Sequence, residues 1–256
     1  MSTEVPAAFA RRIFEEVHTD LPREAPGSAE CTERALAALG GGAGIEAVLD
    51  IACGPGTQTL DLARLLPDAW ITAIDLHRPF IERARERARA AGVADRVTFE
   101  TADMNNLSYP DASFDLLWCE GGIYLMGVLE ALDAWRRLLV PGGAVAFTDA
   151  VWLGDAAPQA LEDWWTAEYA KIGSIDNCLD LVAAAGFSVL EHFVLPETAW
   201  EAYYGPMQTR IDVLGERYRG DQAALSVLAE SEREIDYYRR WSAHYGYLFV
   251  VARRVD

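Results

Sequence analysis

Positive charge is scarce in this sequence and comes almost entirely from arginine, since Lys171 is the only lysine. Lys and Arg together number 22 against 40 Asp and Glu, which gives a net charge of −18. A protein of that charge repels phosphate backbones and anionic lipid headgroups. We therefore expect neither nucleic acid nor a membrane as the main partner.

Paired cysteines and metal-ligand spacings are also missing. The four cysteines are widely scattered without a CxxC pair, which argues against a disulfide framework and against a zinc site. No group of His, Asp or Glu has the spacing of metal ligands. We expect reduced thiols and no bound metal.

Long apolar runs are absent as well. No stretch approaches the roughly 20 apolar residues that a membrane span needs, and the amino-terminal MSTEVPAAFARRIFEEVHTD carries charges where a signal peptide is apolar. We therefore expect a soluble, cytoplasmic protein. With 51% hydrophobic and 24% charged residues, the 256-residue chain can form one large or two small globular domains.

What the sequence does contain is a repeated alternation of strand and helix. The turn after the first apolar run leads directly into a helix, and further helices are expected over 79–92 and 125–139. Apolar, non-alternating strands separated by helices predict a parallel sheet that is buried on both faces. The expected strands of this part are 47–52, 70–75, 97–103, 114–119 and 144–152.

Both ends of the chain have a different character. The pattern predicts helices at 7–18 and 29–39, separated by a Pro/Gly loop and followed by a GGGAG linker. Beyond residue 152 the expected elements are a helix over 158–185, a strand over 187–195, two long helices over 197–243 broken near Gly220, and a strand over 245–253 that returns to the same sheet. We expect a helical cap over 1–44 and a main domain over 45–256 with a helical insertion at 196–243.

The segment VLDIACGPGTQT at 48–59 places a glycine turn between a strand and a helix, where unpaired backbone N–H groups gather and a ligand can approach closely. A small ligand is expected there, at the carboxyl ends of the strands. The dinucleotide fingerprint aligned on Gly54 and Gly56 would require a third glycine where Thr59 stands, and no GKS or GKT follows to make a P-loop.

This turn resembles motif I of the class I S-adenosylmethionine-dependent methyltransferases, in which an acidic residue ends the first strand and a GxGxG turn follows. Asp50, Ala52, Cys53, Gly54 and Gly56 occupy the motif, with alanine in place of the first glycine. Because alanine disfavours a positive φ, we expect residue 52 to keep an ordinary backbone conformation.

Two further motifs follow in the family's order. The resemblance implies that Asp75, at the end of the second strand, accepts hydrogen bonds from both ribose hydroxyls, with Leu76 beside it. It also implies that Ala102, Asp103 and Met104 bind the adenine, since a carboxylate accepts from the exocyclic amine and a thioether lies well on a purine. The aspartates that end three successive strands are thus all expected to contact the cofactor.

The resemblance extends to the segment LLVPGGAVAF at 138–147, which is similar to the turn before the family's fifth strand, and to the whole chain, which is similar to a poorly characterised bacterial branch. It implies an α/β fold with a seven-stranded, mostly parallel Rossmann-like sheet, an antiparallel last strand, an N-terminal helical cap and a C-terminal helical insertion. It implies S-adenosylmethionine as cofactor and methyl transfer to a small-molecule acceptor, either an amine, a phenol or a thiol.

Residues after the fourth strand are candidates for catalysis. The family commonly presents residues to the methyl acceptor from the position of Glu120, whose carboxylate can bind a cationic amine or take a proton, or simply start the next helix. Tyr124 is expected to hydrogen-bond the acceptor or the cofactor, or to pack. Cys119 is a candidate for cofactor contact, for a nucleophile or for an arsenic ligand, although a lone cysteine closing a strand more often packs in the core.

Other polar residues have two readings. Thr57 and Gln58 begin the helix after the glycine turn and either contact the cofactor or cap the helix. His77 covers the adenosine edge or lies in solvent. If the acceptor is a phenol or a thiol, a base is needed, and Tyr124 and His77 are the candidates for it. The remaining histidines, His18, His192 and His244, have no partner pattern, and we expect them to be structural.

Segments outside the sheet also supply candidates. The resemblance implies that the N-terminal segment folds over the methionine end of the cofactor. Trp200, Tyr203 and Tyr204 share one helix face of the insertion, where they either pack as core or form a lid that cages an ammonium group or stacks on a planar acceptor. The N-terminal candidates are Arg23, Gly27 and Ser28.

Two other classes of function stay open at this point. A nicotinamide-dependent oxidoreductase would need the third glycine and a fully parallel sheet. A non-catalytic regulator that binds S-adenosylmethionine would be recognised by a closed acceptor cavity. The sequence leaves the acceptor and the oligomeric state open, a homodimer included.

Overall fold

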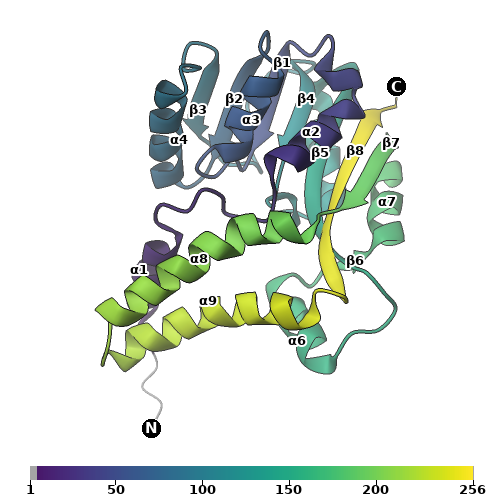
Figure 1. Cartoon of the computed structure of the whole chain (residues 1–256). Helices are drawn as coiled ribbons and strands as arrows, with labels where there is room; N and C mark the ends of the chain where they lie inside the picture. The colour runs from purple at the N-terminus through teal and green to yellow at the C-terminus, as the bar shows by residue number, and fades with distance from the viewer. Residues whose placement is uncertain (1–4, 256) are drawn as a thin grey trace.

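One twisted sheet runs through the molecule and carries helices on both faces (Figure 1). The computed structural model describes residues 5–255. The strand order is β3-β2-β1-β4-β5-β8-β7, and β8 is antiparallel to both of its neighbours. This confirms the predicted fold class and its reversed last strand. The strands are β1 (Ala47–Ile51), β2 (Trp70–Asp75), β3 (Val97–Thr101), β4 (Phe114–Cys119), β5 (Leu139–Trp152), β7 (Phe187–Val194) and β8 (Tyr245–Arg254), and the short β6 (Gly173–Ser174) pairs with the end of β5.

The strands are apolar throughout because both faces of the sheet are covered. In β1, Val48 packs into a core that includes α2 (Ala29–Ala37), α3 (Thr57–Leu65) and α4 (Arg78–Ala90). Its neighbour Leu49 packs on the opposite face, with α5 (Val128–Trp135) and α7 (Ile175–Ala184). Successive residues of a strand point to opposite faces, so a doubly covered strand has no polar side.

A third core lies below the carboxyl ends of the strands. The long helices α8 (Glu197–Arg217) and α9 (Gln222–Trp241) form the insertion between β7 and β8. They lie side by side in this core (Figure 1). They pack with α1 (Ala7–His18) and α6 (Gln159–Glu168) around a core rich in Trp and Tyr. This layer places aromatic side chains opposite the edge of the sheet at which the glycine turn lies. The cap predicted over 1–44 begins with four residues that lie outside those described.

The prediction of a single helix over 158–185 was wrong. Helix α6 ends at Glu168, and α7 begins at Ile175 with Ser174 as its N-cap, whose hydroxyl accepts from the Asn177 N–H at 3.1 Å. Gly173 and Ser174 are drawn into the sheet as β6, and pairing with β5 requires an extended backbone. The helix expected over 125–139 is also shorter, because 3₁₀ turns flank α5 on both sides.

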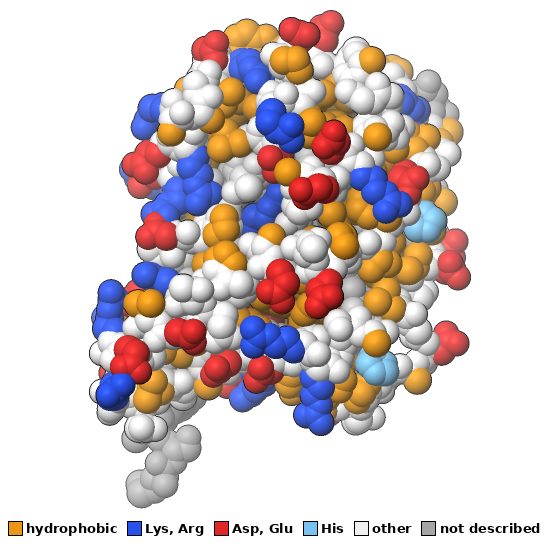
Figure 2. Space-filling view, in the orientation of Figure 1, with side chains coloured by type: hydrophobic (Ala, Val, Ile, Leu, Met, Phe, Trp, Pro, Cys, Tyr) orange, Lys and Arg blue, Asp and Glu red, His pale blue; other side chains and the backbone are white. Residues whose placement is uncertain are grey.

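The surface agrees with the charge of the sequence. Figure 2 shows Arg side chains interspersed with Asp and Glu over the face seen in Figure 1, which is the pattern of a solvated surface. Among residues 5–255, no helix is both long enough and apolar enough to cross a bilayer.

Candidate active site

The glycine turn after β1 has a strained backbone at its first position. Ala52 adopts φ +58°, and Gly54 and Gly56 adopt +53° and +85°. The expectation of an ordinary conformation for Ala52 was therefore wrong. The methyl group of Ala52 is accommodated because residue 122 is glycine, where a Cβ would come within 2.5 Å of it. The turn geometry is held by the packing around it, at a cost of about 1–2 kcal/mol for an L-residue.

Replacing Ala52 by Gly should stabilise the fold. The relief of backbone strain exceeds the roughly 0.5–1 kcal/mol of extra chain entropy that glycine loses on folding, so we expect a gain of up to about 1 kcal/mol in the free energy of unfolding, measured in urea. The matched control is Ala43→Gly, since Ala43 is exposed and has φ −57°. Ala43→Gly should destabilise slightly; an equal loss in both variants would contradict strain at Ala52.

A crevice of about 230 Å³ lies between the glycine turn, residues 23–25 and the end of β4. Asp50 lies beneath the turn and does not line this crevice. Its side chain is fully buried, the Thr59 hydroxyl donates to Oδ2 at 2.5 Å, and Oδ1 has no partner. Burial raises the pKa of Asp50 to about 8. Asp50 thus connects β1 to helix α3, and its contact with the cofactor stays a prediction.

The first residues of α3 also bond within the protein. The Thr57 hydroxyl donates to the carbonyl of Pro22, and the Gln58 amide donates to the carbonyl of Cys53 at 2.9 Å. Gln58 lines the crevice all the same. Both residues thus fix the turn and the chain segment above it, and their contact with the cofactor stays a prediction.

Asp75 is placed as a ribose ligand requires. Oδ2 accepts from the Gly54 N–H at 2.9 Å and Oδ1 from the His77 N–H at 2.8 Å. Each carboxylate oxygen keeps an unused acceptor direction, so a vicinal diol can bind to both. Burial raises the pKa of Asp75, and the backbone donors at His77 and Gly54 oppose this shift.

The residues predicted to bind the adenine lie next to Asp75 and are at least partly exposed. Leu76 is 69% exposed, and Ala102 and Met104 are half-buried beside the third strand. Asp103 is exposed, with Oδ1 accepting from the backbone and side-chain amides of Asn105 at 2.9 and 2.8 Å, and these bonds lower the pKa of Asp103. An apolar surface with an ionised acceptor at its rim fits a purine that carries an amine.

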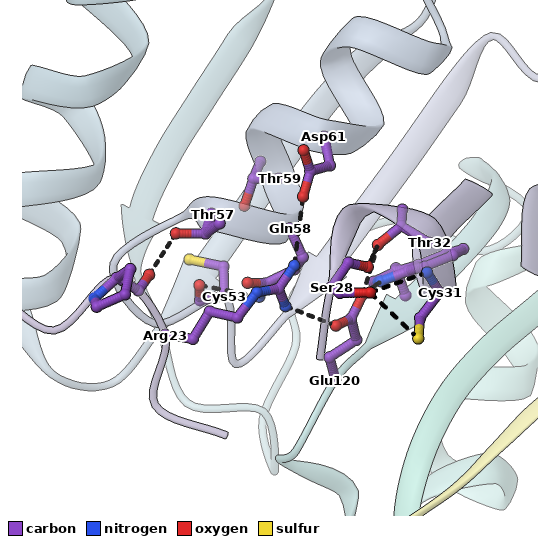
Figure 3. A network of polar contacts seen from close by, with 12 residues as sticks. Arg23, Ser28, Cys31, Thr32, Cys53, Thr57, Gln58, Thr59, Asp61 and Glu120 are labelled. Atoms are coloured by element: carbon purple, nitrogen blue, oxygen red, sulfur yellow. Dashed lines mark hydrogen bonds and ion pairs between the residues drawn. The ribbon is translucent and has the colours of Figure 1, made fainter. Parts of the chain in front are cut away.

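A strap, residues 19–28 between α1 and α2, lines one side of the crevice. Figure 3 shows the polar contacts that hold it. Arg23 donates to Glu120 Oε2 at 2.8 Å and to Asp61 Oδ2 at 3.3 Å. The other oxygen of Glu120 accepts from Trp118 Nε1 at 2.9 Å and from the Thr32 hydroxyl at 3.2 Å. Both members of the Arg23–Glu120 pair are buried, at 6% exposure each.

These bonds change the interpretation of Glu120. The sequence pattern indicated a carboxylate free to bind an amine or take a proton, but both oxygens are already engaged by donors from the protein. A second anchor of the strap, which the sequence analysis missed, is Arg87 on α4, which donates to the carbonyls of Leu21, Pro22 and Pro55. In sequence, Arg87 is indistinguishable from the surface arginines around it.

Neither cysteine at the crevice is a nucleophile. Cys53 and Cys119 have no exposed surface, and burial raises the pKa of both thiols. A neutral, enclosed thiol reacts poorly.

The crevice opens directly into an aromatic cavity. The crevice, of about 230 Å³, is lined by the strap, the glycine turn and the end of β4, and the cavity, of about 360 Å³, lies above α8 and α9. Tyr124 and Gly121 belong to both linings, together with strap residues. The ring of Tyr124 meets Tyr169 edge to face at 5.7 Å. A ligand in the cavity would therefore reach the methionine end of the crevice past Tyr124.

The sequence offered two roles for Trp200, Tyr203 and Tyr204, core packing and the wall of an acceptor site. The structure places them where both roles are possible. The three side chains are 3–5% exposed and belong to the third core. They also line the aromatic cavity, and Trp200 stacks on Tyr238 with ring centroids 4.0 Å apart. Contact with an acceptor remains a prediction for all three.

A His–Glu pair lies where the crevice and the aromatic cavity meet. His18 Nδ1 lies 2.6 Å from Glu24 Oε2, and both side chains are largely buried. Glu24 lines the crevice and the cavity, and His18 lines the cavity. Glu24 Oε1 has no hydrogen-bond partner, and burial raises the pKa of Glu24. The sequence pattern offered no partner for His18, whereas the structure pairs it with Glu24. No sequence signal marks the pair, because a loop containing Asp20 at φ +69° brings it together.

Comparison with known proteins gives the class to which this fold and crevice belong. Residues 48–143 match the family described as "Methyltransferase domain". The 27-O-demethylrifamycin SV methyltransferase of Amycolatopsis mediterranei is 31% identical over 226 residues, covering 82% of this chain and 77% of that protein. The chain belongs to the class I S-adenosylmethionine-dependent methyltransferases. The predicted enzyme class and cofactor are confirmed.

Two further relatives define the extent of the likeness. Methyltransferase GfsG of Streptomyces halstedii is 37% identical over 149 residues, which cover 56% of this chain and 53% of that protein. The chain thus spans only about half the length of GfsG. A methyltransferase of Geobacter sulfurreducens in complex with S-adenosyl-L-homocysteine has the same fold, with a TM-score of 0.80 at 24% identity over 94% of this chain and 97% of that one.

Proposed function

We propose that this protein transfers a methyl group from S-adenosylmethionine to a hydroxyl oxygen of a small molecule held in the aromatic cavity. The observation that carries the proposal is the His18–Glu24 pair at the junction of crevice and cavity. The name of the rifamycin relative, which describes an O-demethylated compound, supports oxygen as the methylated atom.

The residues divide the work of the reaction. When bound, S-adenosylmethionine supplies an electrophilic methyl group. A hydroxyl is a weak nucleophile until it loses its proton, and His18 is the base that takes it at Nε2, since Nδ1 is engaged by Glu24. The Glu24 carboxylate orients the ring and stabilises the imidazolium that forms. Tyr124 orients the acceptor oxygen, and the surrounding rings exclude water.

Glu120 has a positioning role in this proposal. Through Arg23 it holds the strap beside the crevice, and the strap carries Glu24. Asp75 binds the ribose, Asp103, Ala102 and Met104 the adenine, and the glycine turn the methionine end. The other two functional classes are less favoured. The reversed β8 argues against a nicotinamide-dependent oxidoreductase, and an open acceptor cavity beside a base argues against a regulator.

The test is a screen of alcohol, phenol, amine and thiol acceptors with S-adenosylmethionine, in which S-adenosylhomocysteine formation is measured. Methylation of alcohols or phenols, with the product mass and site checked by spectrometry, would support the proposal. Turnover confined to amines or thiols would contradict it.

Asp75→Ala tests the cofactor site independently of the acceptor. We expect it to weaken S-adenosylhomocysteine binding by about 1–3 kcal/mol, because the ribose hydroxyls lose their acceptors. Calorimetric titration gives the affinity. Asp95→Ala, which removes an exposed carboxylate before β3, is the control and should bind normally. Unchanged affinity in Asp75→Ala would rule out the ribose assignment.

A further inference from the structure

The aromatic cavity has an excess of negative charge. Among residues 5–255, its lining contains the carboxylates Glu24, Glu168 and Glu234 but no Lys or Arg, and His18 is the one basic side chain. Glu24 is paired with His18. Glu234, on α9, receives one hydrogen bond, from the Tyr204 hydroxyl at 3.1 Å to Oε1, and among the described residues no donor reaches Oε2. A carboxylate left in such a place is stabilised by a cation that enters with the ligand.

The walls around Glu234 also suit a cation. Trp200 has its ring centroid 5.6 Å from that of Tyr204 and 5.2 Å from that of Tyr247, and all three line the cavity with Trp164. Aromatic faces attract ammonium groups through their quadrupoles, and the attraction grows when the site is shielded from water. Carboxylate and rings together therefore favour an ammonium over a neutral group of the same size.

A second observation points to a ligand in the same place. Trp165 is 7% exposed and lines the cavity, and within the described part of the chain its indole N–H has no hydrogen-bond partner. An indole N–H can only donate, so an acceptor atom on the ligand would satisfy it. The cavity thus offers a cation site and a donor to one molecule.

We infer that the methyl acceptor carries a cationic amine in addition to its nucleophilic oxygen, and that Glu234 and Glu168 bind this amine among the rings of Trp164, Trp200 and Tyr204. This inference rests on the proposed function. A protonated amine has no lone pair and cannot accept a methyl group, so the amine is the recognition group. The oxygen is then left beside His18, and the substrates are amino alcohols or aminophenols.

The test compares two small probes, the benzylammonium ion and the neutral benzyl alcohol, in calorimetric titrations of the full chain with S-adenosylhomocysteine present. We expect benzylammonium to bind about tenfold more tightly. Glu234→Gln should abolish this preference while S-adenosylhomocysteine binds as in the parent protein. Glu232→Gln, which removes an exposed carboxylate two positions earlier on α9, should retain it.

Three results would overturn the inference. The first is equal binding of the two probes, and the second is a preference for benzylammonium that survives in Glu234→Gln. The third is N-methylation of benzylamine when S-adenosylmethionine replaces S-adenosylhomocysteine. The first two leave the proposed function standing, because neither concerns His18. Conversely, if substitution of His18 has no effect on turnover, the proposed base fails while the charge preference of the cavity is unaffected.

Discussion

Replacing His18 by Asn lowers kcat by about two to four orders of magnitude, the usual contribution of a general base, while S-adenosylhomocysteine binds as before. Asn is chosen because its amide can still hydrogen-bond Glu24 at the place of Nδ1, so that the strap keeps its position. The variant lacks only the nitrogen that takes the proton. Steady-state kinetics with an acceptor from the screen give kcat, and calorimetry gives the cofactor affinity.

The pH dependence distinguishes a lost base from a displaced substrate. Without His18, a phenolic acceptor must ionise in solution before it can react, so the rate of the variant should rise more steeply with pH than the rate of the parent protein. His192→Asn, on the exposed face of β7, is the matched control and should leave kcat unchanged. A His18→Asn protein with parental kcat and pH profile would refute the base.

Replacing Arg23 by Met destabilises the folded protein by about 3–5 kcal/mol, because Glu120 is left charged and unpaired in a buried site. The strap also loses its main anchor, so cofactor affinity and turnover should fall together. Urea unfolding gives the stability, and calorimetry the affinity for S-adenosylhomocysteine.

Adding Glu120→Gln to Arg23→Met separates lost charge pairing from lost packing. Since both charges are then gone, the double variant should recover part of the stability, and its loss should be smaller than the sum of the single losses. Arg34→Met is the control: the pair Arg34–Glu191 is 56% and 37% exposed, so its removal should cost less than about 1 kcal/mol. Strictly additive losses would show that Arg23 and Glu120 are not coupled.

Local patterns predicted the sheet except for β6 and the first residues of β5. Strands β2 and β4 begin and end at the predicted residues, because a strand covered on both faces must be apolar along its whole length. The glycine turn and the placement of Asp75 after the second strand were equally visible, since parallel strands bring their carboxyl ends to one edge. Family and cofactor followed from this order of short motifs.

Local patterns failed where the partner is distant or the backbone is strained. Arg23 and Glu120 lie 97 positions apart, and neither residue type signals the other. Ala52 takes a glycine conformation only because Gly122, on another strand end, makes room for its methyl group. The helix over 158–185 is interrupted because β5 has an edge with which Gly173 and Ser174 can pair.

The amino-acid sequence by itself determined the sheet, the cofactor class and the edge at which the site lies, because these depend on periodic burial and on motifs a few residues long. Tertiary structure alone decided what surrounds the acceptor: the pairing of His18 with Glu24, the anchoring of Glu120, and the rings and carboxylates of the cavity. The physical reason is that the charge and hydrogen bonding of a buried side chain depend on neighbours supplied by other helices, and those neighbours are fixed only when the helices pack.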